Sequence, residues 1–155
     1  MSRVYIFAKS PCRITDTMTK DFEILDHTAD VGIIAYGADL KQAFANAAKG
    51  LFSLITSLGD VEEALHRDID LTAADEESLL VDWLNELVYY FDAEGILFKR
   101  FEIIELNDTH LKARGYGEKA DNTKHELKTG VKAATYHMLK IEKNNGYRLQ
   151  VIFDI

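Results

Sequence analysis

Apolar and polar residues alternate in two short stretches where the periodic part of the chain begins. Phe22 and Ile24 alternate with polar neighbours, residues 26–30 interrupt the pattern, and Val31 and Ile33 resume it. A two-residue period places every second side chain on the same face of a β-strand. The pattern therefore predicts two short strands joined by a polar turn.

Two later stretches carry apolar residues at the spacing of a helix. In the first these are Leu40, Ala43, Phe44, Ala47, Leu51, Leu54 and Ile55. Asp39 precedes that stretch as an N-cap, and Gln42 follows three residues later as in a capping box. The second stretch follows Asp75 and ends at Gly95, which can adopt the left-handed conformation that closes a helix. We predict two amphipathic helices, each needing a sheet or another helix against its apolar face.

The remaining segments are strand-like. Residues 69–73 alternate, and a turn at 107–109 joins two further runs. The clearest pair is 131–141 and 147–153, separated by Asn-Asn-Gly at 144–146. These elements predict an α+β fold: a two-layer single domain with two amphipathic helices packed on a mainly antiparallel β-sheet.

The loop at 144–146 also predicts the register of the last hairpin. With Gly146 in the left-handed position, Ile141 lies opposite Leu149. An unbroken ladder then places Tyr136 opposite Asp154. Lys132 shares their face, four residues along and roughly 13 Å away at strand spacing.

The periodic segments divide the chain into two parts. Residues 21–155 form the predicted domain, without a second domain or repeat. Residues 1–20 contain the only proline and show no sustained period, so we interpret them as an N-terminal extension whose order the pattern does not decide. They lack the apolar core and cleavage site of a signal peptide, and no stretch of the chain is apolar enough to cross a membrane.

Charge and cysteine content limit the partners and the cellular location that we expect. The net charge is -8, with 26 acidic against 18 basic residues, which disfavours stable direct binding of nucleic acid. A basic protein or a cation is the more natural partner. Cys12 is the single cysteine, so an internal disulfide is excluded, and we expect a cytoplasmic protein without a membrane partner.

Candidate chemistry is concentrated in a few carboxylates, because standard nucleotide, zinc-protease and serine-hydrolase motifs are missing. Asp30 follows the first turn and precedes a buried strand. Asp154 and Ile155 end an apolar strand, where two carboxylates would attract a cation. From the residues alone, a turn cap at Asp30 and a solvated Asp154 remain the favoured alternative. Lys132 likewise fits an ordinary solvent-facing strand lysine.

Several segments, taken in order, resemble the archease family. They are 22–32 (FEILDHTADVG), 80–87 (LVDWLNEL), 124–129 (KHELKT), 131–137 (VKAATYH) and 151–155 (VIFDI). No single block is diagnostic, but the combination is specific and covers residues 21–155. Two features depart from the family: Gly130 stands where an acidic residue is common, and the extension lies outside the pattern.

The resemblance implies an accessory protein that activates an RtcB-type RNA ligase. Such a ligase joins a 3′-phosphate end to a 5′-hydroxyl end in tRNA splicing and RNA repair, and uses GTP and manganese to guanylylate itself. The family member promotes guanylylation and multiple turnover. The resemblance implies one divalent cation, calcium first and manganese or magnesium as alternatives, held by Asp30, Asp154 and Ile155. Lys132 and His27 are implied as further functional residues.

Two other classes of function remain open. A stand-alone metal-dependent phosphoesterase would use the same acidic residues, but a two-metal hydrolase usually gathers more carboxylates or histidines. A general chaperone-like modulator would need no metal. The resemblance favours the ligase activator, which is not itself an enzyme.

Overall fold

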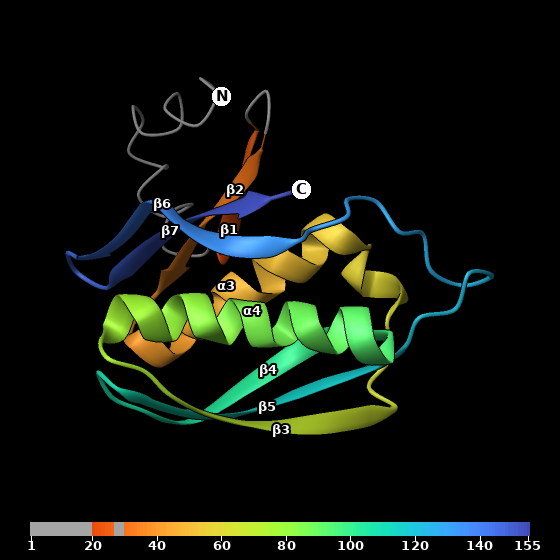
Figure 1. The fold of residues 1–155 in the computed structure, drawn as a ribbon, viewed down its shortest axis with the longest axis horizontal. Helices are drawn as coiled ribbons and strands as arrows, with labels where there is room; N and C mark the ends of the chain where they lie inside the picture. Colours follow the sequence, from red (N-terminus) through yellow and green to blue (C-terminus); the bar gives the residue numbers. More distant parts are fainter. Residues whose placement is uncertain (1–19, 27–29) are drawn as a thin grey trace.

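The computed structural model describes residues 20–26 and 30–155. They form two helices and seven strands in two antiparallel sheets (Figure 1). The helices are α3 (Leu40–Ile55) and α4 (Glu76–Glu94), with a short 3-10 helix, η2 (Leu58–Asp60), after α3. The strands are β1 (Phe22–Asp26), β2 (Val31–Gly37), β3 (Leu65–Thr72), β4 (Ile96–Leu106), β5 (His110–Lys119), β6 (Ala133–Lys143) and β7 (Tyr147–Asp154).

The helix ends follow the predicted capping chemistry. An Oδ1 oxygen of Asp39 accepts a bond from the Gln42 N–H at 2.8 Å, and Asp75 caps α4 by accepting from Ser78. Gly95 ends α4 at φ 68°, in the left-handed region. These predicted helix boundaries are therefore confirmed. Among the described residues, neither helix is long and apolar enough to cross a membrane.

The strands divide into two sheets, and the helices lie between them (Figure 1). One sheet has the order β1-β2-β7-β6 and the other β3-β5-β4. The predicted α+β class, with two helices on antiparallel strands, is confirmed. The helices form a middle layer, however, where the pattern predicted two layers. The reason is that each helix buries more than one stripe: α4 buries Leu79 and Val88 beside its main apolar row.

The β6–β7 hairpin confirms part of the predicted register and corrects the rest. Ile141 lies opposite Leu149 as predicted, and Gly146 has φ 121°. Beyond Lys140 the register shifts, so residues 136–139 bulge out of the ladder. Tyr136 therefore does not lie opposite Asp154, and that prediction is wrong.

Side chains stabilise this bulge by replacing ladder bonds. The Gln150 amide donates to the Met138 carbonyl at 2.9 Å, and the Thr135 hydroxyl donates to the Ile152 carbonyl at 2.8 Å. Met138 adopts a positive φ of 55°, which costs free energy for a residue with a Cβ. The bulge moves the start of β6 along β7, which determines where Lys132 lies.

Candidate functional site

The ends of β2 and β7 bring Asp30 and Asp154 to the same edge of the four-stranded sheet. Val31 pairs with Phe153 in the antiparallel ladder. Asp30 directly precedes Val31 and Asp154 directly follows Phe153, so continuing the register places the two aspartates opposite each other. Ile155 follows and is 46% exposed. Three of the sequence-predicted residues therefore meet at one edge, which we call the acidic edge: Asp30, Asp154 and Ile155.

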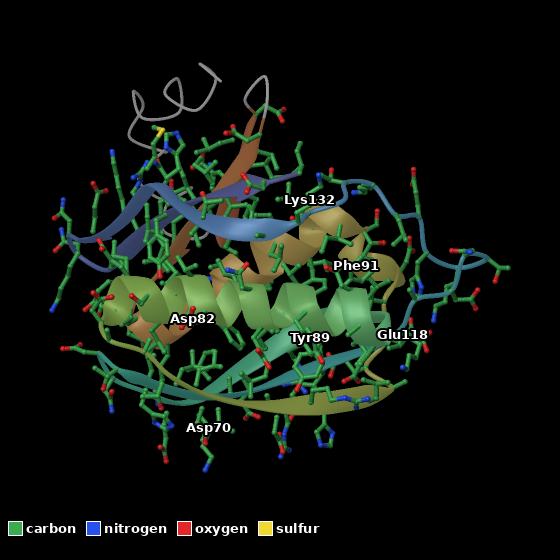
Figure 2. All side chains as sticks on the ribbon, in the orientation of Figure 1. Asp70, Asp82, Tyr89, Phe91, Glu118 and Lys132 are labelled. Carbon is green, nitrogen blue, oxygen red and sulfur yellow. The ribbon has the colours of Figure 1, made fainter. Side chains whose placement is uncertain are left out.

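Lys132 lies much closer to the acidic edge than the sequence predicted. Ala133 pairs with Asp154, and the Lys132 N–H donates to the Asp154 carbonyl at 2.8 Å. The predicted separation of roughly 13 Å between Lys132 and Asp154 assumed an unbroken ladder. The bulge in β6 interrupts that ladder, so the predicted separation does not apply. Figure 2 shows Lys132 where the chain enters β6, and the residue is exposed.

His27 lies outside the described residues. In the sequence it lies between Asp26, the last residue of β1, and Asp30, which directly precedes β2. Its predicted functional role remains a prediction.

Asn85 positions the start of β6 and was not singled out from the sequence. Its side-chain oxygen accepts from the Ala134 N–H at 2.7 Å, and its side-chain nitrogen donates to the Ala134 carbonyl at 3.3 Å. One amide thus occupies the strand edge as a neighbouring strand would. Asparagine is a poor residue for a helix interior because its side chain competes for backbone bonds. Its presence inside α4 was the signal that could have revealed this contact.

The segment before Lys132 is attached to the end of α3. The N–H groups of Lys128 and Thr129 donate to the carbonyls of Ile55 and Leu54 at 2.7 and 3.1 Å. The buried Thr56 hydroxyl donates to the Glu126 carbonyl at 2.8 Å. These contacts satisfy carbonyl groups that a helix end leaves without partners. They also hold the approach to β6 in place.

A polar cluster around Glu118 secures the start of the same segment, at the end of β5 (Figure 2). Glu118 accepts from Lys124 at 2.8 Å, from the Glu62 N–H at 2.8 Å and from His125 at 2.9 Å. The Lys124 bond, followed by the Glu62 N–H, lowers the pKa of Glu118 from 4.5 to about 2. The buried His125 ring accepts the Asp121 N–H at Nδ1, so its proton sits on Nε2.

The donor atoms of the acidic edge suit a hard divalent cation. Two side-chain carboxylates and a terminal carboxylate offer only oxygen, which calcium, magnesium and manganese prefer. Neither Asp30 nor Asp154 makes an ion pair with another residue in the described ranges, so their charge is not neutralised there. Within the same ranges, no three His, Cys, Asp or Glu side chains converge as a ready metal cluster. The set predicted from the sequence adds Ile155 to the two aspartates.

Fold and site together define a small α+β protein in which two aspartates and the last residue lie at one edge of a sheet. The family model of the Archease protein family matches residues 22–155. The chain belongs to the archease family.

Individual relatives agree with this assignment. Protein archease from Sulfolobus acidocaldarius is 43% identical over 136 residues, covering 86% of this chain and 98% of the relative. The solution structure of a Methanobacterium thermoautotrophicum protein matches with a TM-score of 0.76 at 39% identity, covering 87% of this chain and 99% of that one. A Thermotoga maritima crystal structure, described as an archease and possible chaperone, has a TM-score of 0.59 at 20% identity, covering 84% and 94%. The last shows the fold alone.

Proposed function

We propose that this protein is a metal-binding accessory factor that activates an RtcB-type RNA ligase by promoting its guanylylation and multiple turnover. The observation that carries the proposal is the acidic edge. The register of β2 and β7, when continued, puts Asp30 opposite Asp154, and the bulge in β6 brings Lys132 close to Asp154. Family membership supports it. The ligase would join 3′-phosphate to 5′-hydroxyl ends in tRNA splicing and RNA repair.

Negatively and positively charged residues of this chain would have different roles in the proposed function. Asp30, Asp154 and the Ile155 carboxylate would hold one divalent cation, calcium first and manganese or magnesium as alternatives. A bound cation would supply positive charge toward oxygen atoms of the partner. Lys132 would add an ammonium group for a phosphate or carboxylate there. Asn85 would keep Lys132 in position through its two bonds to Ala134.

Charge distribution supports a protein partner rather than RNA. The net charge of -8 repels a phosphate backbone and attracts a basic protein surface. The protein would then work in the cytoplasm beside the ligase, without a membrane partner, and would not itself be an enzyme.

A ligase assay tests the proposal. Substoichiometric protein should raise guanylate loading and product yield when added to the cognate ligase with GTP, manganese and broken RNA. Lys132→Ala should lose most of that effect. Lys112→Ala is the matched control, because Lys112 is an exposed lysine like Lys132 but lies in β5 on the other sheet. Equal activation by both variants would contradict the proposed role of the acidic edge.

The possible-chaperone description of the Thermotoga maritima structure keeps a second candidate in view. A chaperone-like modulator should protect unrelated proteins from aggregation, with or without a divalent cation. A stand-alone phosphoesterase should release phosphate without the ligase. Phosphate release that is lost in Asp30→Asn would favour the enzyme, and metal-independent protection would favour the chaperone.

A further inference from the structure

The bulge in β6 is large and changes the register of this strand on β7. On the hairpin side Lys140 pairs with Gln150, and beyond the bulge Thr135 pairs with Ile152. The four residues 136–139 therefore lie opposite one residue of β7, three more than an unbroken ladder holds. A common bulge has only one extra residue. Something in the structure must therefore hold this backbone out of the ladder.

The bulge also decides which side chain of β6 enters the core. Side chains alternate along a strand, so an odd number of extra residues reverses the faces of everything before the bulge. Ala134 consequently lies opposite Phe153, and both belong to the core. An unbroken ladder would put His137 opposite Phe153, whereas the structure leaves His137 exposed. The bulged register thus keeps a polar ring out of the core.

One side chain of β7 bonds to the bulge. The Gln150 side-chain nitrogen donates to the Met138 carbonyl at 2.9 Å. In the described ranges, no other side chain from outside β6 bonds to residues 136–139. A bulge leaves backbone groups without ladder partners, and Gln150 supplies one of the missing partners. Gln150 therefore stabilises the bulged register from the neighbouring strand.

The backbone of Met138 opposes the same register. Met138 has a φ of 55°, in the left-handed region that a residue with a Cβ disfavours. Glycine adopts this conformation without that steric cost. The bond from Gln150 offsets the cost at the residue that bears it. Asn85 supports the register independently by bonding to Ala134 from α4, so loss of the Gln150 bond should loosen β6 without unfolding the protein.

We propose that Gln150 is a positioning residue for Lys132. Its bond to Met138 holds β6 in the bulged register, and this register places the Lys132 N–H on the Asp154 carbonyl at 2.8 Å. In an unbroken ladder Lys132 would lie four residues beyond the partner of Asp154, roughly 13 Å away. Gln150 would affect ligase activation only through Lys132, so that consequence rests on the proposed function.

Amide hydrogen exchange in the full chain tests this role without a ligase or a cation. Gln150→Met keeps the length of the side chain but removes the donor, so the Lys132 N–H should exchange about fivefold faster. Gln150→Glu also removes the donor and should have the same effect. Gln42→Met is the matched control, because Gln42 is the other glutamine of the chain and bonds at the start of α3. Unchanged exchange at Lys132 in both Gln150 variants would overturn the proposal.

A spectroscopic signature separates positioning from a general gain in stability. The NMR coupling across the hydrogen bond between the Lys132 nitrogen and the Asp154 carbonyl carbon reports their geometry in the folded protein. It should fall in Gln150→Met, and Met138→Gly in that background should restore it by removing the cost of the bulge. A coupling that stays unchanged in Gln150→Met, or that Met138→Gly does not restore, would overturn the proposal.

Ligase activation distinguishes this proposal from the proposed function. Gln150→Met should lose activation as Lys132→Ala does, and should regain it when Met138→Gly is added. Exchange and coupling that change as expected while activation is retained would support the positioning of Lys132 by Gln150. The same result would contradict the role of Lys132 in activation.

Discussion

The outer faces of the two sheets differ in kind. On the three-stranded sheet, Asp68 pairs with Arg114 at 2.6 Å and Asp70 bonds to His110 at 2.7 Å. Figure 2 shows Asp70 pointing away from the helices. On the four-stranded sheet the same side carries the buried Ile34 and Ile152. The outer face of the three-stranded sheet is polar, as is common for an antiparallel sheet, whereas that of the four-stranded sheet also contains buried apolar residues.

The acidic edge lies on the four-stranded sheet. Asp30 and Asp154 continue β2 and β7, which also carry Ile34 and Ile152. Both sheets pair charged residues on their outer faces: Asp68 with Arg114 on the three-stranded sheet, and Glu142 with Arg148 on the four-stranded sheet. Under the proposed function, the four-stranded sheet would carry the interacting residues Asp30, Asp154 and Lys132.

The largest expected effect on stability is at Ile34, on the outer face of the four-stranded sheet. Ile34→Asp should lower the free energy of unfolding by about 3–5 kcal/mol, because it buries an unpaired charge. Chemical denaturation of the full chain measures the loss. Arg114→Ala on the other outer face is the control and should cost far less, since its ion pair is exposed. Equal losses would show that the two faces do not differ.

A smaller effect is expected at Asn85. Asn85→Ala should lower the free energy of unfolding by about 1–2 kcal/mol, because two backbone bonds to Ala134 are lost. Asn85→Asp keeps the acceptor and repels the carbonyl, so the N–H of Ala134 should stay better protected than in Asn85→Ala. Denaturation and amide hydrogen exchange at Ala134 measure the two quantities. Unchanged exchange in both variants would contradict the positioning role.

The fold could be predicted wherever local chemistry decides it. The caps at Asp39 and Asp75 and the closing Gly95 determine the helix ends through contacts within a few residues, and all three were readable from the sequence. The division into two sheets was not, because strand periodicity is identical in one sheet and in two. Which strand pairs with which depends on contacts far apart in the chain.

The candidate site shows the same limit. Asp30 and Asp154 could be selected as strand-end carboxylates, and continuing the β2–β7 register places them together. The position of Lys132 was misjudged, since the bulge depends on Gln150 bonding to Met138 across the hairpin. Such a bond involves side chains whose proximity exists only once the strands have paired. A polar residue inside a helix, Asn85, was the one readable sign of how β6 is held.

A pH-dependent effect is expected at Glu118. Because its folded pKa is about 2 against an ordinary 4.5, ionised Glu118 stabilises the fold above pH 4.5 and loses this contribution as the pH falls toward 2. Glu118→Gln should cost about 1 kcal/mol at pH 7, through the weaker bonds of a neutral acceptor. The free energy of unfolding of both proteins, measured from pH 7 to pH 2, should converge at the acidic end. A constant difference across that range would contradict the assignment.

The smallest effect on stability is expected on the solvent-exposed outer face of the three-stranded sheet. Asp68→Asn removes an exposed ion pair with Arg114, and the midpoint of denaturation should barely move. Added salt should reduce even that difference, because it screens exposed charges. A large, salt-independent loss of stability would show that the wet face contributes more to the fold than its exposure suggests.

Cation titration by calorimetry tests most directly whether the acidic edge is the binding site of this molecule. Titration of the full chain with calcium, and separately with manganese, should show one site. Asp30→Asn and Asp154→Asn should each weaken its affinity more than about tenfold, or about 1.4 kcal/mol. Asp70→Asn, an equally conservative change of an exposed strand aspartate on the other sheet, should leave the affinity unchanged. Unaltered affinity in Asp30→Asn and Asp154→Asn would contradict the account.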